Sequence, residues 1–209
     1  MHRTVQLAAW GYVAVCAALI WRASGREPVT AAFISSGAPA GGGPIADAVE
    51  WFRRVKPYCN SVEIGFVRGN APPAGWQGSG FLAACHALAG RIDESRRIID
   101  RLPKDEQWRA AGIIFDVGHP IADAGDDRAA GPIMELVVDY WPNHYMALYH
   151  AGMAEYMLGQ SALAERNLSQ FLRIYTANDG WTRNAREVLT RLKDPAGAGA
   201  KDLRRPMDP

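Results

Sequence analysis

The stretch from Tyr145 to Thr176 constrains the fold more than any other part of the sequence. Apolar residues recur at three- and four-residue intervals on both sides of Gly159, which is the spacing of an amphipathic helix. We therefore expect two antiparallel helices in this stretch, joined at a turn that contains Gly159. The rest of the sequence is consistent with further copies of this unit, preceded by an anchor and followed by a tail.

The residues before this unit repeat its spacing. A copy begins at Trp108, has the small residues Ala111 and Gly112 in its first helix, and ends at Pro142. Gly152 takes the place of Gly112 in the next copy. The second helix of the two copies has matching positions at Ala130, Met134 and Val137, and at Ala164, Leu168 and Phe171. Small residues let two helices approach closely, and proline ends the second helix because it cannot continue it.

Counting between the small residues predicts units of unequal length. The separation of Gly112 and Gly152 is 152 − 112 = 40, and the spacing places the additional length in a turn around His119 to Asp127. A degenerate first copy starts near Trp76, and its equivalent positions are Ala83, the turn glycine Gly90, then Ser95, Ile99, Leu102 and Pro103. Since 112 − 83 = 29, the second helix of that copy is expected to be shortened.

This pattern resembles the tetratricopeptide repeat, W-x2-L-G-x2-Y followed by A-x3-F and P over about 34 residues. The resemblance covers residues 76–193, with Glu155 at an aromatic position and no proline after Tyr175 as departures. It implies an all-α fold, in which about three helix pairs form a short α-solenoid. Trp181 to Leu192 is expected to be a capping helix, whose inward residues are Ala185 and Leu189 and whose outward residues are Arg183, Arg186 and Arg191.

The amino-terminal segment, residues 1–25, has the composition of a membrane segment. From Val5 to Trp21 the only clearly polar side chain is Gln6, and a helix of this length is about 25 Å long, slightly short of a bilayer core. We expect residues 1–25 to be a single-pass transmembrane signal-anchor that contacts the lipid bilayer through residues 5–21. The expected location is the bacterial inner membrane, with the repeats in the periplasm. The alternative is a cleaved signal peptide, because Ala23, Ser24 and Gly25 offer small residues at a cleavage site.

Two further segments differ from the repeats in composition. Residues 26–44 are rich in small residues and are predicted to be a flexible linker, and residues 194–209, rich in glycine and proline, a disordered or extended tail. Residues 45–75 are predicted to be a helix at Ile45 to Val55 and an irregular connection packed on the repeats. Within that connection Val62, Ile64 and Phe66 fit a strand or a helix, and Asn70 to Gly75 is expected to be a loop.

Two cysteines lie outside the apolar run, Cys59 and Cys85. An oxidising compartment could join them in a disulfide. Two buried free thiols are the alternative.

The resemblance implies that function resides on the concave face, where the first helix of each pair holds a segment of another protein. In the last unit, the residues expected to bind a partner there are Met146, Tyr149, Met153, Tyr156 and Met157. Thioether and aromatic side chains adapt well to a partner surface. The alternative is that this α-helical stripe packs against another element of the same chain, such as the helix at Ile45 to Val55.

The acidic turn is the other candidate site, and it contains Asp116, His119, Asp123, Asp126 and Asp127. Its spacing does not follow the calcium-binding helix-loop-helix pattern. Asp126 or Asp127 is instead expected to cap a helix that begins near Arg128. No metal site is predicted, and the weak candidates for one are Asp116, Asp123, Asp126 and Asp127. The histidines His86, His144 and His150 have no cysteine or carboxylate companion at ligand spacing.

The remaining features limit the classes of function. A net charge of +1, with 23 basic and 22 acidic residues, gives no reason to expect nucleic acid. Motifs for haem attachment, phosphate binding or a nucleophile elbow are missing, so neither an enzyme nor a cofactor is expected. The expected function is a non-enzymatic, membrane-anchored interaction or scaffold protein that docks to other protein subunits or stabilises their membrane complex. A bacterial respiratory or photosynthetic complex is one example.

The alternative function starts from the cleaved signal peptide. In that case the chain is an exported soluble protein, which assists an envelope enzyme or binds a small ligand near Tyr149, His150 and Met153.

Overall fold

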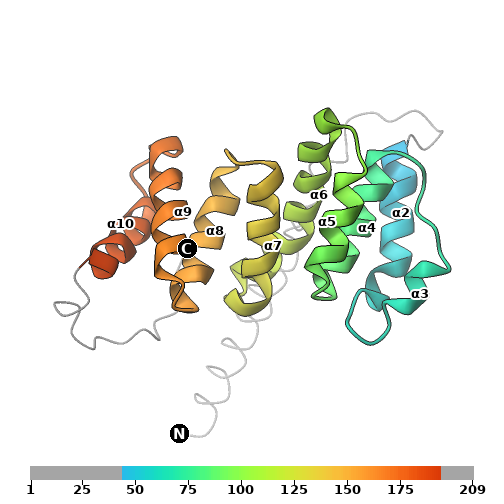
Figure 1. Ribbon diagram of the computed structural model, residues 1–209, viewed down its shortest axis with the longest axis horizontal. Helices are drawn as coiled ribbons and strands as arrows, with labels where there is room; N and C mark the ends of the chain where they lie inside the picture. The colour runs from blue at the N-terminus through green and yellow to red at the C-terminus, as the bar shows by residue number, and fades with distance from the viewer. Residues whose placement is uncertain (1–43, 194–209) are drawn as a thin grey trace, which may run out of the picture. The chain divides into compact units, whose positions relative to one another are not determined.

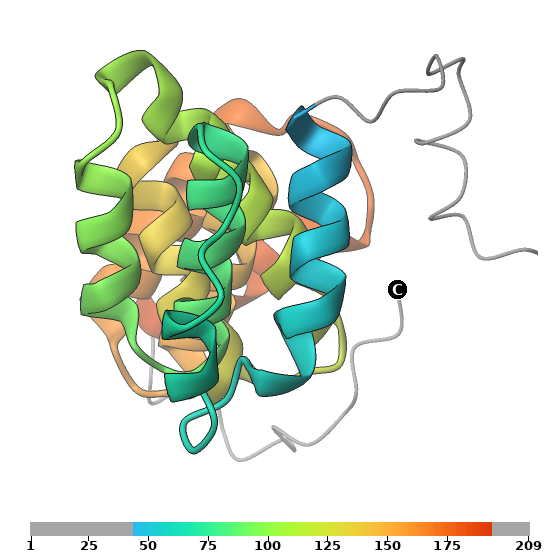
Figure 2. The ribbon, with the colours of Figure 1, turned by 90° about the vertical axis from the view of Figure 1, so that its right-hand side faces the viewer.

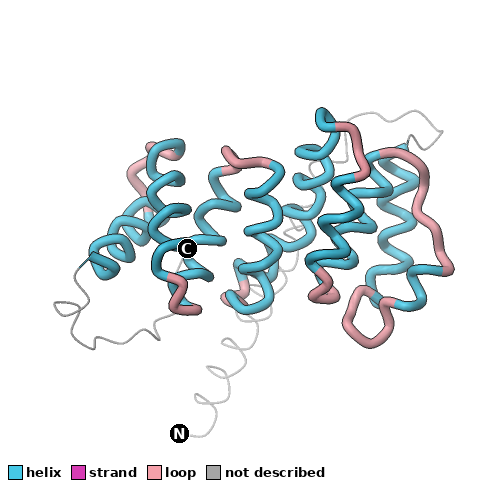
Figure 3. The backbone as a smooth tube through the Cα atoms, in the orientation of Figure 1, coloured by secondary structure: helices cyan, strands magenta, loops and turns pink. Residues whose placement is uncertain are grey.

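The computed structural model describes residues 44–193, which form helices and no strand (Figures 1 and 3). The elements are α2 (Pro44–Val55), the 3-10 helix η2 (Lys56–Tyr58), α3 (Gly65–Arg68), α4 (Trp76–Leu88), α5 (Ile92–Asp100), α6 (Lys104–Asp123), α7 (Asp127–Tyr140), α8 (Tyr145–Met157), α9 (Ser161–Ile174) and α10 (Gly180–Lys193). The predicted all-α class is therefore confirmed for this part of the chain.

The predicted anchor, most of the linker and the tail fall on residues 1–43 and 194–209, which lie outside the described part. Between residues 44 and 193, no helix combines the length and the apolar composition needed to span a bilayer.

Three helix pairs follow one another, α4 with α5, α6 with α7, and α8 with α9. The turns inside the pairs are three residues long and carry a central glycine, namely Gly90, Gly125 and Gly159, with φ values of 71°, 76° and 77°. This left-handed conformation suits glycine, since it has no Cβ to clash with the carbonyl group. The turns lie along one edge of the stack, and the connections between pairs lie along the opposite edge (Figure 3).

The repeats are nearly equal in length, which corrects the predicted insertion and deletion. The residues that occupy equivalent places in the first helices are Ala83, Gly118 and Gly152, so the two periods are 118 − 83 = 35 and 152 − 118 = 34. Gly112 is therefore not the equivalent of Gly152. The additional length of this unit lies at the start of α6, which begins at Lys104, and α6 continues through Pro120 to Asp123 where a long turn was expected.

Glycines allow each pair of neighbouring helices to approach closely. A Cβ added at Gly118 of α6 would lie 2.6 Å from Ile133 Cγ2, and one at Gly152 of α8 would lie 2.7 Å from Leu168 Cγ. The same is true of Gly131, whose added Cβ would lie 3.0 Å from Ala154 Cβ. At Gly112 the nearest atom, in the Trp141 ring, is at 3.4 Å, an ordinary contact. Gly80 of α4 is similar, since its added Cβ would lie 2.8 Å from Ile113 Cδ1 of α6, so the helix contacts require small residues at Gly80, Gly118, Gly131 and Gly152.

We expect Gly152→Ala to lower the free energy of unfolding by about 1–3 kcal/mol, because the new methyl group overlaps Leu168 and the backbone of α9. Gly112→Ala is the matched control. It adds the same methyl group inside a helix without overlap, so it is expected to stabilise the protein by about 0.5–1 kcal/mol. Urea unfolding of the two variants beside the parent chain measures both effects, and equal effects of the same sign would contradict the packing described above.

The amino-terminal helix packs on the first pair. Figure 2 looks onto that end of the stack, where α2 lies beside α4. Trp51, Phe52 and Val55 of α2 are buried against α4, and the Trp51 indole Nε1 donates a hydrogen bond to the carbonyl oxygen of Asn70 at 3.0 Å. The ambiguous segment around Val62 to Phe66 is resolved as irregular chain followed by the short helix α3, and residues 70–75 form the predicted loop.

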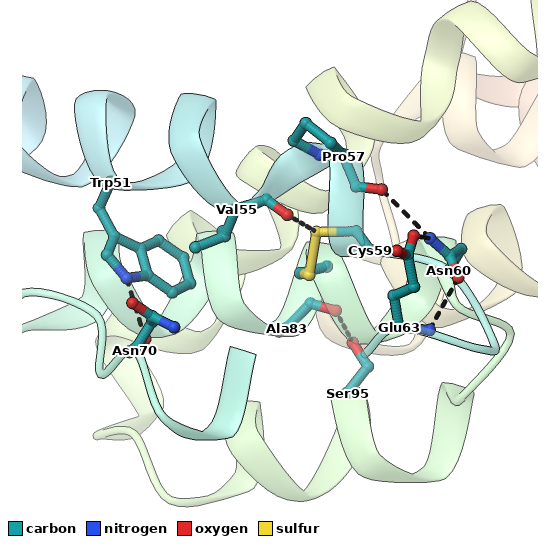
Figure 4. The surroundings of a disulfide bond; sticks show 10 residues. Trp51, Val55, Pro57, Cys59, Asn60, Glu63, Asn70, Ala83 and Ser95 are labelled. Atoms are coloured by element: carbon teal, nitrogen blue, oxygen red, sulfur yellow. Dashed lines mark hydrogen bonds between the residues drawn. A yellow bond between two sulfur atoms is a disulfide. The ribbon is translucent and has the colours of Figure 1, made fainter. Parts of the chain in front are cut away.

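A disulfide bond joins this segment to the repeats. The sulfur atoms of Cys59, which follows η2, and Cys85 of α4 are 2.04 Å apart (Figure 4). Nearby, Ser95 Oγ of α5 donates a hydrogen bond to the Ala83 carbonyl oxygen of α4 at 2.8 Å, which ties the two helices of the first pair together.

The last helix covers the other end of the stack. Ala185 and Val188 of α10 are buried against α8 and α9, and Leu189 packs beside them. Of the predicted outward residues, Arg183 and Arg186 are exposed and Arg191 is half-buried. Asp179 precedes α10 and caps its first turn, since its Oδ1 accepts a hydrogen bond from the Thr182 backbone N–H at 3.2 Å.

Candidate functional site

The stripe predicted on α8 is divided between the interior and the surface. Tyr149 and Met153 are only 6% and 5% exposed, and they lie in one cluster with Phe171 of α9 and Val188 of α10. Met146 and Tyr156 are half-buried. Met157 alone is well exposed, at 50%.

Tyr149 and Met153 therefore pack against another element of the same chain, and the prediction of an open partner surface there is wrong for these two residues. The covering element is α10 rather than the helix at Ile45 to Val55, because the chain turns back after α9 and lays Trp181 against the Tyr149 ring at 4.8 Å. The same packing buries Tyr149 and Met153, two of the three residues near which the alternative function placed a small ligand.

The predicted acidic turn is instead mostly helix. Asp116, His119 and Asp123 lie on α6, and Asp127 is the first residue of α7. Asp126 performs the predicted capping, since its Oδ1 accepts a hydrogen bond from the Ala129 backbone N–H at 3.1 Å. Asp126 and Asp127 are thus placed at a helix start, and Asp116 and Asp123 on an adjacent helix.

A continuous row of aromatic side chains, with one arginine among them, lies along the edge of the stack that carries the connections between helix pairs. We call it the aromatic edge, and its members are Trp76, Trp108, Arg109, Trp141, His144, Tyr145 and Tyr175. Arg109 lies between the rings of Trp76 and Trp108, with its guanidinium carbon 6.0 Å and 5.5 Å from their centroids. The row thus crosses from the start of α4 to the end of α9.

Along the aromatic edge, the ring contacts at Trp141 are edge-on, and those at Tyr145 are stacked. Trp141 meets Trp108 edge-on, with 5.2 Å between centroids, and also meets His144 edge-on at 4.6 Å. Tyr145 stacks on Tyr175 at 4.9 Å with an interplanar angle of 9°. Trp108 and Tyr145 remain 43% and 39% exposed. The row is therefore a supported surface, in which each exposed ring is held by the ring beside it.

His144 has a structural role at this edge. Its Nδ1 atom accepts a hydrogen bond from the Ala147 backbone N–H at 3.2 Å and so caps α8. Burial lowers the pKa of the His144 imidazole, so the neutral form, which can accept this bond, is favoured.

Inward of the edge, two histidines and an aspartate from different helices meet. Asp123 Oδ1 lies 3.3 Å from His119 Nε2, one turn earlier on α6, and 3.7 Å from His150 Nε2 on α8. The two imidazole rings face each other edge-on, 5.0 Å apart. Both Nε2 atoms are buried and make no hydrogen bond. Burial, aided by the neighbouring His119, lowers the pKa of His150 to about 4, so this imidazole is neutral at neutral pH.

Sequence reasoning did not find this group. The carboxylate companion of His150 is far from it in the sequence, at position 123, and only the pairing of α6 with α7 and α8 brings it near. The signal available in the sequence was the spacing of His119 and Asp123, four positions apart, which places both on one face of a helix. We did not use this spacing as evidence for a site, because the segment from His119 to Asp127 was expected to be a turn.

No family model matches this chain, and no match was found among curated proteins or solved structures.

Proposed function

We propose that this chain is a membrane-tethered docking protein, in which a short stack of tetratricopeptide-like helix pairs holds another protein subunit at the aromatic edge. The observation that carries the proposal is the aromatic edge, a row of Trp, Tyr and Arg side chains joined through His144, in which Trp108 and Tyr145 are still exposed. These residue types contribute most of the binding energy in protein interfaces, because they bury a large area at a small cost in conformational entropy.

The periods of the helix pairs support the repeat assignment. The periods of 35 and 34 agree with the length of about 34 residues that is typical of tetratricopeptide repeats. The buried positions of the second helices recur with the same periods, at Ser95, Ala130 and Ala164. A stack of three such pairs with a covering helix at its end is the smallest arrangement expected to be stable.

The tether is proposed from the sequence of residues 1–25. An apolar helix from Val5 to Trp21 would hold the stack near the bilayer through a short linker. Confinement of this kind raises the effective concentration of the stack near a membrane-bound partner. A small edge contact with modest intrinsic affinity would then be sufficient, and the partner is accordingly proposed to be a membrane protein complex.

Capture from native membranes tests the proposal. We expect the full chain, solubilised in mild detergent, to retain a membrane protein in constant ratio, and a Trp108→Ala, Tyr145→Ala double variant to recover at least tenfold less of it. Met157→Ala with Leu158→Ala is the matched control, because these two apolar side chains are exposed to a similar degree at the opposite edge. Equal recovery by the edge variant and the control would refute the proposed site.

A further inference from the structure

The group formed by His119, Asp123 and His150 has the geometry of a metal site. Each residue offers one ligand atom, and the three atoms lie within 4.8 Å of one another. An ion with nitrogen and oxygen ligands at about 2.0–2.1 Å in tetrahedral arrangement separates those ligands by about 3.4 Å. The two separations that involve Asp123 Oδ1, 3.3 Å and 3.7 Å, agree with this value. The three ligand atoms all lie within 4.8 Å of one another, so closing on one ion requires them to approach by at most about 1.4 Å.

The buried imidazole nitrogens require a partner that the described residues do not provide. Buried polar atoms in proteins are nearly always hydrogen-bonded, and an isolated one is costly. Here two of them, the Nε2 atoms of His119 and His150, are directed towards the same carboxylate oxygen without a hydrogen bond to it. In its Nε2–H tautomer either imidazole could donate to Asp123, but at 3.3 Å and 3.7 Å neither ring makes that hydrogen bond. A cation among the three groups would satisfy both nitrogens at once.

The repeat pattern indicates that helix packing does not require these side chains. The residues at the place of His119 in the other first helices are Ala84 and Met153, since 119 − 84 = 35 and 153 − 119 = 34. The place of Asp123 is occupied by Leu88 and Met157. The other pairs have apolar residues at these positions, so the repeat itself does not call for the histidine and the aspartate on α6.

The donor set selects the kind of ion. Calcium and magnesium prefer oxygen ligands only, whereas two imidazoles and one carboxylate suit zinc and similar divalent transition ions. The Asp123 side chain is 56% exposed, so the outer side of the group faces solvent. Water can therefore complete the coordination.

We propose that His119, Asp123 and His150 bind a zinc ion that links α6 to α8, with water at the remaining coordination position. This site is independent of the proposed docking function, because it lies on different residues and can be tested without a partner.

The test is metal binding by the full chain, purified without a histidine tag and stripped with chelator. We expect titration calorimetry to show one Zn²⁺ per chain, and Co²⁺ used as a spectroscopic probe to give the visible absorption of a low-coordinate nitrogen and oxygen site. His119→Gln and His150→Gln are each expected to weaken Zn²⁺ binding at least tenfold. Zinc is also expected to raise the Tm of the parent chain but not of these variants.

Three further variants keep the result interpretable. Asp123→Asn changes an exposed side chain that the fold does not need, so weaker binding in this variant cannot be ascribed to unfolding. His86→Gln is the matched control, because His86 is a buried histidine of α4 outside the group, and Asp116→Asn changes a carboxylate of α6 that is not a ligand. Both should bind Zn²⁺ like the parent. Failure of the parent chain to bind Zn²⁺, or binding that is unchanged in His119→Gln, His150→Gln and Asp123→Asn, would overturn the proposal.

Discussion

Loss of the Cys59–Cys85 disulfide is expected to lower the free energy of unfolding by about 3.5 kcal/mol, the largest single effect we anticipate. The bond closes a loop with a sequence separation of 26. Closing a loop of this length removes conformational entropy from the unfolded chain, and the chain-entropy relation gives about that amount at 25 °C. The bond also holds η2 and the end of α2 against α4, so its loss should loosen this segment first.

Denaturant unfolding of the full chain, oxidised and after reduction, measures this effect. A Cys59→Ala, Cys85→Ala double variant provides the control, because its stability should not respond to reductant and should be close to that of the reduced parent. Hydrogen exchange is expected to increase in residues 44–70 before it increases in α8 and α9. A loss below about 1 kcal/mol, or a uniform increase in exchange, would show that the remaining contacts of Trp51 and Phe52 hold the segment without the bond.

The second large effect concerns Glu155, a carboxylic acid buried inside the last helix pair. Its side chain is completely buried, and Asn167 Nδ2 donates a hydrogen bond to Oε1 at 2.7 Å, whereas Oε2 makes none. Burial raises the pKa of Glu155 to about 7, although the hydrogen bond from Asn167 acts in the opposite direction. Folding therefore takes up a proton at this residue between the unfolded pKa, about 4.3, and about 7.

The stability that Glu155 contributes in its protonated form is complete below about pH 4 and is lost as the pH rises through 7. Glu155→Gln imitates the protonated form and should escape this loss. We expect the variant to gain about 2–3 kcal/mol relative to the parent between pH 5 and pH 8, since each pKa unit corresponds to about 1.4 kcal/mol. The difference between the two proteins is the useful quantity, because His150, whose pKa burial lowers to about 4, adds its own pH dependence below about pH 6.5 in both proteins alike.

Urea unfolding of both proteins at several pH values measures the difference. Glu165→Gln is the matched control, because Glu165 is exposed on α9 and its replacement should leave the pH profile unchanged. If Glu155→Gln and the parent kept a constant difference from pH 5 to pH 8, Glu155 would have to be ionised throughout in the folded protein.

The second helices of the pairs were predictable from the sequence. Ala130, Met134 and Val137, and their equivalents Ala164, Leu168 and Phe171, are all buried as their spacing indicates. A buried face of one helix repeats every three or four residues, and this pattern is local information. The turn at Gly159 was predictable for the same reason, since a left-handed residue is needed within a short connection.

The first helices could not be aligned from their residues alone. α6 contains two glycines at helix-compatible positions, Gly112 and Gly118, and the sequence does not say which one faces a neighbouring helix. The choice depends on the distance to α7, where only Gly118 meets a side chain too close for a Cβ. Trp108 favoured the incorrect alignment on Gly112, because the repeat signature begins with a tryptophan at the same distance. In the structure Trp108 is exposed and lies on the amino-terminal extension of α6.

The candidate sites depend on still longer-range information. Whether Tyr149 and Met153 are open or covered is decided by the path of α10, which starts only at Gly180, beyond the whole of α9. The group of His119, Asp123 and His150 likewise exists only after α6 and α8 have been brought together by α7. For the stripe on α8 and for the histidine–aspartate group, side-chain types alone can indicate candidate residues. Which of these residues are buried, exposed or close together depends on contacts between helices.

The most direct test of the docking proposal is site-specific photocrosslinking in intact cells. A photoreactive phenylalanine derivative would replace Trp108 or Tyr145 at the aromatic edge, or Met157 or Leu158 at the opposite edge, one position at a time in the full chain. We predict that both edge positions form an adduct with the same membrane protein and that neither control position does. No adduct from Trp108 and Tyr145, or the same adduct in equal yield from all four positions, would contradict docking at the aromatic edge.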